Sequence, residues 1–158
     1  MFSIVRILFT AFKGKNNSSK IFLDYIKCEN KLWLTNSYKI SIKEFKYWTV
    51  CVRKKHLTLK DAVILLKREV PSESQMIPQE AAEVPKVLKW YKDVYTKKIG
   101  AVRFNYMIIM MKDFFVHYHA FSRYDKTVHF FGTDWNDKDY PGSFDFKEGV
   151  ILDEDKIQ

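Results

Sequence analysis

One long helical stretch set between strand-like stretches is the feature that most constrains the fold of this chain. Pro78 suits the first position of a helix, and the acidic Glu80 and Glu83 suit its positive N-terminal end. Apolar residues at helical spacing follow, Pro85 within them should kink the helix, and Gly100 is a typical stop signal. Because strand-like residues flank this helix on both sides, we predict an α+β fold in which one long helix packs on an antiparallel sheet.

The predicted strands are rich in β-branched and aromatic residues and lie between polar or turn-forming segments. They span residues 31–35, 39–45, 47–53, 62–66, 102–111, 114–124 and 128–131. The simplest connection between the last two long runs is an antiparallel hairpin. The segment from Gly132 onward contains Asp, Asn, Pro and Gly with few apolar anchors, so it predicts a long loop.

Length and composition predict one folded domain with polar ends. The chain has 158 residues, and its 47% hydrophobic and 16% aromatic content favours folding over disorder. We predict an N-terminal extension at residues 1–20, a domain at residues 21–146 and an acidic C-terminal tail at residues 147–158. No segment reaches the ~20 apolar residues that a membrane-spanning helix needs. Cys28 and Cys51 lack metal or redox spacing, so we expect reduced cysteines in a cytoplasmic protein.

The net charge of +8 is concentrated in the first part of the chain. Residues 1–60 carry 13 Lys and Arg against 3 acids, whereas residues 61–158 carry 14 against 16. Such a basic segment is often only a solvated surface, but it also attracts polyanionic ligands such as nucleotides.

Two of the four histidines, His117 and His119, lie two positions apart in the predicted strand at residues 114–124. Because side chains alternate across a strand, both imidazoles should lie on one face, together with Arg123. Two imidazoles rooted about 7 Å apart, with a guanidinium further along, form a surface suited to a phosphate.

Four interpretations of this histidine pair stay open on spacing alone. The pair could be structural, bind a metal, act in phosphoryl chemistry or belong to a nucleic-acid surface. A catalytic zinc site needs a third protein ligand, and no spacing argues for the candidates His56, Asp113 or His129. Phosphoryl chemistry needs a neutral imidazole, which is a good nucleophile near pH 7 and can form a covalent phosphoramidate.

The run from Lys112 to Tyr124, preceded by Asn105-Tyr106, resembles the signature of the histidine triad (HIT) family, in which histidines alternate with apolar residues before an arginine. Upstream, residues 62–66, the basic residues after them and the start of the helix are similar to that family's strand, turn and long helix. The resemblance covers roughly residues 31–131. It implies a HIT-like α+β domain similar to that of diadenosine-polyphosphate hydrolases.

The chain departs from the family pattern at the first histidine. With Arg123 as the anchor, Phe115 stands in place of the first triad histidine, His117 takes the central position and His119 the third. The alternative register makes His117 the first residue and His119 the central one, with Phe121 in place of the third. The arginine anchor favours the former register.

The resemblance implies that the central histidine, His117, is the covalent nucleophile, and we predict that His119 supports the phosphate. Asn105, Lys112 and Arg123 are the predicted substrate- and phosphate-binding residues. The implied activity is hydrolysis or nucleotidyl transfer on a dinucleoside polyphosphate, or a related nucleotide conjugate, through a nucleotidyl-histidine. No protein-bound metal or cofactor is predicted, although Mg²⁺ could accompany the substrate's phosphates.

Two other functions remain open. One is a catalytically impaired nucleotide-binding protein, which is favoured by Phe115 and by the basic residues 53–55, near where the family has a ribose-binding Asn or Asp. The other is a metal-dependent hydrolase. The predicted partner is a small nucleotide rather than a stably bound nucleic acid, and the resemblance weakly implies a homodimer.

Overall fold

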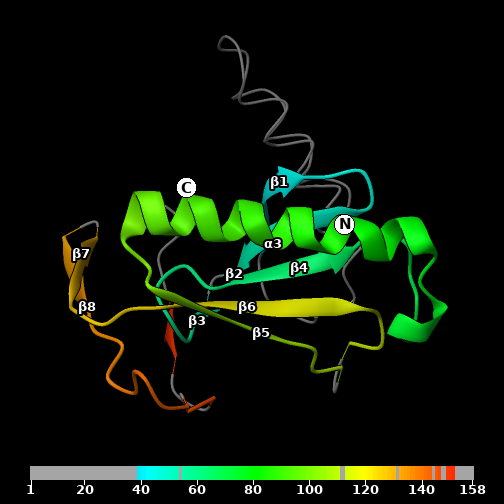
Figure 1. Cartoon of the computed structure of the whole chain (residues 1–158). Helices are drawn as coiled ribbons and strands as arrows, with labels where there is room; N and C mark the ends of the chain where they lie inside the picture. The colour runs from blue at the N-terminus through cyan, green and yellow to red at the C-terminus, as the bar shows by residue number, and fades with distance from the viewer. Residues whose placement is uncertain are drawn as a thin grey trace, which may run out of the picture.

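The fold is seen in a computed structural model, which describes residues 39–53, 55–110, 113–130, 132–143, 145–146 and 149–151. Within these residues, one α-helix packs on a five-stranded antiparallel sheet with the strand order β1-β2-β4-β6-β5 (Figure 1). This arrangement confirms the predicted fold. The predicted strand at residues 31–35 lies outside the described residues.

The central sheet is assembled from segments on both sides of the helix. Its strands are β1 (Lys39–Glu44), β2 (Trp48–Arg53), β4 (Ala62–Leu66), β5 (Arg103–Met107) and β6 (His117–Arg123), and the helix α3 (Pro78–Ile99) connects β4 to β5 after the short 3-10 helix η1 (Glu73–Gln75). Two small sheets flank it: β3 (Lys55–His56) with β9 (Val150–Ile151), and β7 (Val128–Phe130) with β8 (Thr133–Trp135).

Local signals at both ends explain why α3 forms where it does. Pro78 occupies the first turn, and the Glu80 carboxylate accepts a hydrogen bond from the backbone N–H of Ile77 at 3.0 Å. Gly100 closes the helix with a φ of 78°, a left-handed conformation that glycine adopts without steric cost. The helix runs without interruption through Pro85, so this proline does not end it.

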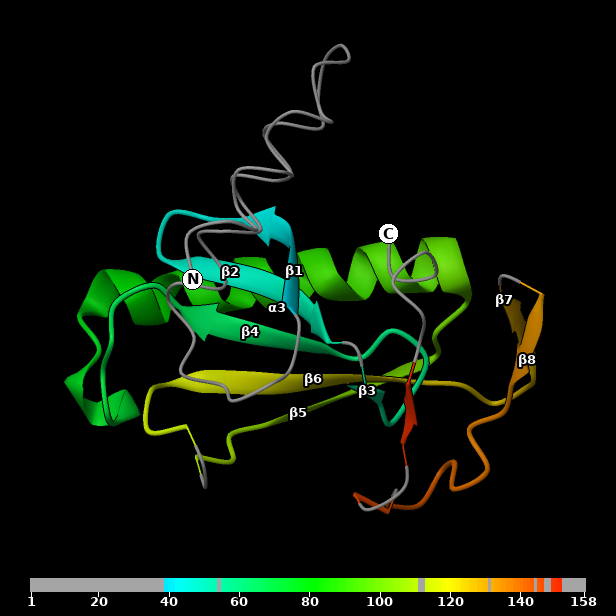
Figure 2. The ribbon, with the colours of Figure 1, turned by 180° about the vertical axis from the view of Figure 1, so that it is seen from behind.

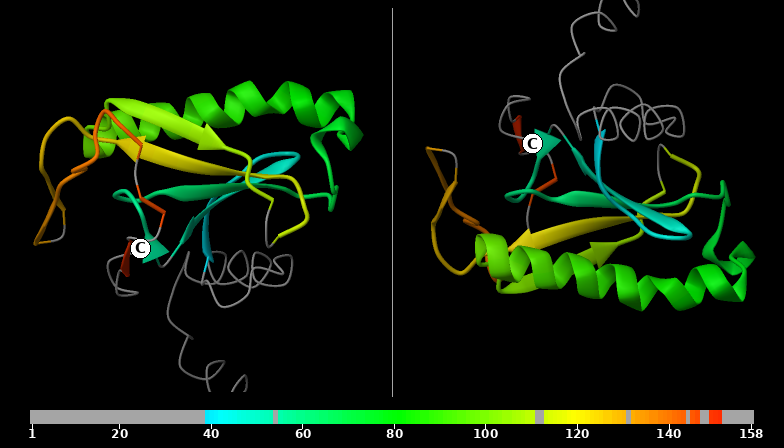
Figure 3. Two further views of the ribbon diagram at one scale, coloured as in Figure 1. Left: turned by 90° about the horizontal axis from the view of Figure 1, so that it is seen from below. Right: turned by 90° about the horizontal axis from the view of Figure 1, so that it is seen from above.

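Helix α3 covers one face of the sheet, as the two edge-on views in Figure 3 show. Val87 and Tyr91 of the helix are fully buried against Trp48 of β2 and Ile64 of β4 in one apolar cluster. The Tyr91 hydroxyl donates a hydrogen bond to the backbone oxygen of Ala120 at 3.1 Å, which ties the helix to β6. Burial of this apolar surface is the main stabilising term of the fold.

The opposite face of the sheet carries the histidines. In the antiparallel register, His117 pairs with Leu65 and His119 pairs with Val63 of the neighbouring strand β4. On the other side of β6, Met107 of β5 pairs with His119. Ala120 of β6 and Ile64 of β4 belong to the apolar cluster with α3, and side chains alternate along a strand. The imidazoles therefore lie on the side away from α3, which passes behind β1 and β2 in Figure 2.

Three features differ from the sequence-based expectations or add to them. The segment after Gly132 is not entirely loop, because β8 pairs with β7, and β9 lies in the predicted tail and pairs with β3. Cys51 is disulfide-bonded, so the expectation of reduced cysteines is wrong for this residue; Cys28 lies outside the described residues. A disulfide is typical of oxidising compartments, so cysteine usage no longer argues for the cytoplasm.

None of the helices among the described residues combines the length and the apolar character needed to cross a membrane.

Candidate functional site

The two histidines of β6 lie in direct contact on one face of the strand. The Nε2 atoms of His117 and His119 are 3.1 Å apart, and the ring centroids are 4.8 Å apart with an interplanar angle of 69°. The period of two along a strand brings these rings together, as the sequence predicts. The site is therefore a pair of interacting imidazoles rather than two separate side chains.

The hydrogen bonds of His117 define which ring nitrogen carries the proton. Its Nδ1 lies 2.7 Å from the backbone oxygen of Phe115, and a carbonyl oxygen can only accept, so Nδ1 carries the proton. In the neutral ring, Nε2 of His117 is then a bare acceptor. His119 therefore donates its Nε2–H to His117. This assignment leaves a nucleophilic lone pair on His117 and a proton donor beside it.

Phe115, the residue that the resemblance places at the first triad position, contributes its backbone to the site. The carbonyl oxygen that orients His117 is a group every residue carries, so the substitution leaves this hydrogen bond intact. His117 is only 2% exposed, whereas His119 is half-buried. His119 is thus the more accessible member of the pair.

Apolar side chains extend the site along the same face of β6. The ring of Phe121 lies nearly parallel to that of His119, with an interplanar angle of 9° and centroids 6.2 Å apart. Phe146 contacts Phe121 edge-on at 6.3 Å and is 48% exposed. An aromatic ring of a ligand could pack against such a surface, although the same contacts also serve ordinary packing.

Arg123 lies at the other end of β6 and is held in a buried ion pair. Its guanidinium donates two hydrogen bonds to the Asp137 carboxylate at 2.6 and 3.0 Å, and one to the backbone oxygen of Gly142 at 2.9 Å. Both side chains are 4% exposed. These contacts give Arg123 the task of anchoring the segment after β8, and a phosphate contact for it stays a prediction.

Of the other two predicted phosphate-binding residues, the structure describes one. Asn105 of β5 is exposed, and its side-chain oxygen accepts a hydrogen bond from Arg123 at 3.2 Å. It pairs with Phe121 across the strands, so it lies on the histidine face, two residue pairs along the ladder from His119. Lys112 lies outside the described residues.

Sequence reasoning missed the partners of Arg123. Asp137 and Gly142 lie in a segment that reads only as polar loop, and Tyr140 of the same segment stacks under the guanidinium groups of both Arg123 and Arg103, about 6 Å from each. No periodic pattern in that segment indicates a buried acid. A charge on the inward face of a predicted strand is the one signal that could have suggested a buried partner.

The remaining histidines belong to separate pairs. His56 is fully buried, and its Nδ1 lies 2.9 Å from the Asp61 carboxylate. His129 lies on β7, and its Nδ1 is 2.8 Å from Asp134 at an exposed position. Among the residues that the structure describes, no group of three or more His, Cys, Asp or Glu side chains is arranged to hold a metal ion. The third ligand that a catalytic zinc site requires is therefore not found in this part of the chain.

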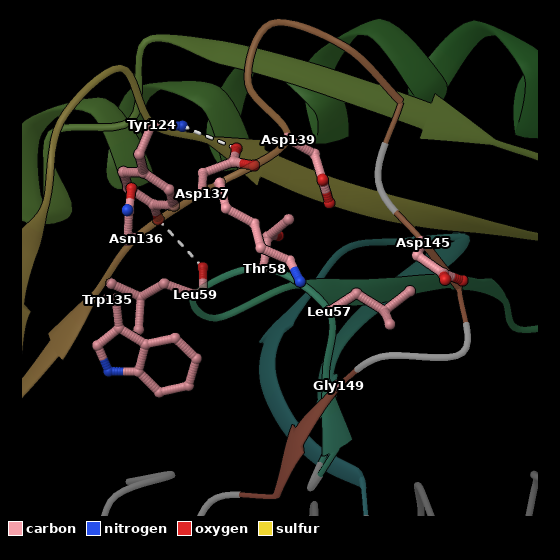
Figure 4. A pocket seen from close by; sticks show the side chains of 11 residues that line it. Leu57, Thr58, Leu59, Tyr124, Trp135, Asn136, Asp137, Asp139, Asp145 and Gly149 are labelled. Atoms are coloured by element: carbon pink, nitrogen blue, oxygen red, sulfur yellow. Dashed lines mark hydrogen bonds between the residues drawn. The ribbon is translucent and has the colours of Figure 1, made fainter.

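A cavity of about 240 Å³ lies beyond the Arg123 end of β6. Figure 4 shows Asp137 and Asp139 on one side of it and Leu57 and Thr58, from the segment before β4, on another. The backbone N–H of Tyr124 donates to the Asp137 carboxylate at 3.2 Å on its wall. Neither histidine of β6 lines this cavity, so it is separate from the candidate site.

Comparison with known proteins places this arrangement among the histidine triad folds. No protein-family model matches the chain, and no curated protein matches it. Among solved structures, a histidine triad (HIT) protein from Sinorhizobium meliloti 1021 superposes with a TM-score of 0.59 at 13% identity, covering 89% of this chain and 87% of that one.

Two further structures agree. A histidine triad protein from Bradyrhizobium japonicum gives a TM-score of 0.56 at 11% identity, covering 75% of this chain and 82% of that one. A hypothetical histidine triad nucleotide-binding protein from Sulfolobus tokodaii strain7 gives a TM-score of 0.53 at 15% identity, covering 65% of this chain and 68% of that one. At such identities the likeness establishes the fold alone: this chain has the fold of histidine triad proteins.

Proposed function

We propose that this chain binds a nucleotide and cleaves its phosphoanhydride through a covalent nucleotidyl-histidine on His117. The observation that carries the proposal is the hydrogen-bonded sequence from the Phe115 carbonyl through His117 to His119. It orients one imidazole with an unprotonated Nε2 and places a second imidazole beside that atom as a proton donor.

The proposed reaction proceeds in two displacement steps. The Nε2 lone pair of His117 attacks the phosphorus, the new P–N bond forms, and the P–O bond to the leaving phosphate breaks. His119 turns its Nε2–H away from His117 and donates it to the leaving oxygen. Water then attacks the phosphorus, the P–N bond breaks, and the nucleotide is released while the water's proton returns to His119. The Nδ1–H of His117 stays with the Phe115 carbonyl throughout, which stabilises the positive charge on the ring.

The resemblance and the fold support the proposed class of substrate. We propose a dinucleoside polyphosphate or a related nucleotide conjugate, with Asn105, Lys112 and Arg123 as candidate contacts to substrate. The Sulfolobus tokodaii protein of similar fold is named as a hypothetical nucleotide-binding protein, which supports a nucleotide as the ligand. The basic first part of the chain favours attraction of an anionic substrate.

A trapping experiment tests this proposal. The full chain is mixed with diadenosine tetraphosphate in buffer containing a chelator, and mass spectrometry follows an acid-labile nucleotidyl adduct. We expect an adduct on His117, no adduct in His117→Ala, and an unchanged adduct in His129→Ala, the matched control at an exposed histidine. Turnover that persists in His117→Ala would overturn the assignment of the nucleophile.

A nucleotide-binding protein without catalysis is the second candidate. It is favoured by Phe115 at the first triad position and by the burial of His117, whose Nε2 is already occupied by the contact with His119. The same experiment separates the two functions. Saturable binding of the nucleotide with neither adduct nor turnover supports this second candidate.

A homodimer and a cytoplasmic location complete the proposal, and both are open to direct measurement. Light scattering on the purified full chain determines the oligomeric state. Because Cys51 is disulfide-bonded, the cytoplasmic location is best tested by fractionation of cells that express the native chain.

A further inference from the structure

The peptide group between Phe115 and Val116 is held from both sides. Its carbonyl oxygen lies 2.7 Å from Nδ1 of His117, and its N–H donates to the backbone oxygen of Val70 at 2.8 Å. A trans peptide group is planar, and its N–H and C=O point in opposite directions. The position of the Val70 oxygen therefore fixes the direction of the Phe115 carbonyl, and with it the orientation of the His117 ring.

The bond to Val70 replaces one bond of the regular ladder between β4 and β6. Leu65 pairs with His117. The same register places Leu66 opposite Val116, and in a hydrogen-bonded antiparallel pair each residue donates to the other. Leu66 donates to the Val116 oxygen at 3.2 Å, but the Val116 N–H donates to Val70 instead. This interruption lies beside the proposed nucleophile, as β-bulges often do beside active sites.

Val70 is held in place by packing and by a turn. Its side chain is fully buried in the apolar core cluster. Two residues earlier, Arg68 donates to the backbone oxygen of Gln75 at 2.9 Å and, through two hydrogen bonds, to the Glu80 carboxylate of α3. These bonds close the segment that connects β4 to η1 and α3 (Figure 1).

We propose that Val70 is a positioning residue for His117 and acts through its backbone oxygen. One chain of hydrogen bonds runs from this oxygen through the peptide group of Val116 to the His117 ring, and each bond polarises the next. Val116 and His117 are almost fully buried, so water does not weaken these bonds. The polarised Phe115 oxygen is a better acceptor, which keeps the ring proton on Nδ1 and leaves Nε2 unprotonated.

The consequence for activity rests on the proposed function. A proton kept on Nδ1 keeps Nε2 of His117 able to attack phosphorus, and the polarised carbonyl stabilises the charge that the ring gains. Loss of the bond to Val70 should therefore lower kcat more than it changes KM, because it affects the ring and not the nucleotide. The tautomer of His117 needs no nucleotide, so it can be measured independently of activity.

Replacing the Val116 amide by an ester tests the chain of bonds in the full-length protein. The hydroxy analogue of valine at position 116 removes the N–H and makes the Phe115 oxygen a weaker acceptor, because an ester lacks amide resonance. The same replacement at Val102 is the matched control, since the Val102 N–H donates to the Arg123 oxygen at 2.9 Å. ¹⁵N NMR of the imidazole nitrogens, without nucleotide, reports which of them carries the proton.

A second ester isolates the contribution of Val70. Lactic acid, the hydroxy analogue of alanine, at position 71 converts the Val70 carbonyl into an ester carbonyl. No donor is lost, because Pro71 has no N–H. Pro71→Ala is the matched control, since it removes the same ring and keeps the amide. Pro71 is exposed, so this chain decides the outcome if the ester at position 116 does not fold.

The wild type and both controls should show a protonated Nδ1 and an unprotonated Nε2 on His117. In both ester chains, we expect part of the population to carry the proton on Nε2. We expect kcat to fall by about tenfold with the ester at position 116 and by about threefold with the ester at position 71. An unchanged tautomer in the latter, an equal change in Pro71→Ala, or a wild-type ring protonated on Nε2 would each overturn the role of Val70.

The positioning role and the proposed function can fail independently. A tautomer change in both esters of a chain that does not turn over diadenosine tetraphosphate keeps the positioning role and rejects the enzyme. Equal turnover in the wild type and both ester chains, with an unchanged tautomer, keeps the enzyme and rejects the positioning role.

Discussion

The two ends of β6 carry polar residues on the same face, yet these residues differ in their contacts and in their burial. At the start of the strand, His117 and His119 contact each other, and one of the rings is half-buried. At its end, Arg123 is surrounded by Asp137, Gly142 and Asn105 and is almost fully buried. The first end places an unprotonated imidazole nitrogen beside a ring N–H donor, whereas the second end neutralises the charge of Arg123 with the Asp137 carboxylate.

This difference shows how much the alternation of side chains along a strand can predict about a site. The alternation of side chains correctly predicts that these residues share one face. It says nothing about the partners that approach that face from elsewhere in the chain, and the partners decide between chemistry and support. A buried arginine that already has a bidentate carboxylate is stabilised where it is, so moving it toward a ligand would cost free energy.

The largest effect is expected at the histidine end. His119→Ala should lower turnover of diadenosine tetraphosphate by about 10²–10⁴-fold, because the leaving oxygen loses its proton donor. The nucleotidyl adduct on His117 should still be detectable when a substrate with a good leaving group is used. Steady-state kinetics in chelated buffer measure the change, with His129→Ala as the control. Turnover within about threefold of the wild type would remove His119 from the mechanism.

At the Arg123 end, we expect a substitution to change the stability of the fold instead of the turnover. Asp137→Ala leaves a buried guanidinium without its carboxylate and should lower the free energy of unfolding by about 3–5 kcal/mol. Asp134→Ala is the matched control, because its ion pair with His129 is 73% exposed on both sides and should contribute less than about 0.5 kcal/mol. Urea unfolding followed by circular dichroism measures both. A loss below about 1 kcal/mol in Asp137→Ala would mean that the pair is not needed to hold this segment.

Much of the fold could be predicted because its signals are local. The strand at residues 62–66 has the predicted bounds, and α3 begins at Pro78 and ends before Gly100 as the capping signals indicate. These signals lie within a few residues of the elements they define. The antiparallel pairing of β5 with β6 follows equally from their closeness in the chain.

The remaining features depend on contacts between distant segments. β9 forms only because it pairs with β3, nearly a hundred residues earlier, and Asp137 becomes buried only because Arg123 lies beneath it. The disulfide at Cys51 likewise leaves no trace in local sequence spacing. The sequence therefore predicts the histidine pair of the site but not the partners that determine the role of Arg123.

A second arginine–carboxylate pair lies near the histidine end of the sheet. Its contribution to stability should depend on pH, and it can be compared with that of the Arg123–Asp137 pair. Arg68 donates two hydrogen bonds to Glu80 at 2.9 and 2.8 Å, and these bonds hold the pKa of Glu80 below its ordinary value of 4.5 despite the opposing effect of burial. A lowered carboxyl pKa stabilises the folded state fully above that ordinary value. The stabilisation is lost as the pH falls through the lower pKa of the folded state.

Glu80→Gln should therefore destabilise the chain by about 1 kcal/mol at pH 7 and by progressively less toward pH 3. The effect is smaller than that of Asp137→Ala because the Arg68 side chain is 48% exposed and water screens its charge. Urea unfolding of both chains at intervals between pH 3 and pH 7 measures the difference. Curves that stay parallel over this range would show that the charge of Glu80 contributes nothing to stability.

The smallest effect is expected at Phe115, where the resemblance predicts a departure from the triad pattern. Because His117 donates to the backbone oxygen of this residue, Phe115→Leu should preserve the orientation of the imidazole and change turnover by less than about threefold. Phe115→His places an imidazole at the predicted first triad position. A rise of about tenfold or more in that variant would mean that the missing side chain, and not only the backbone, serves the reaction. The wild-type chain would then be catalytically impaired. The histidine end of β6 would differ less in role from the Arg123 end, which is structural.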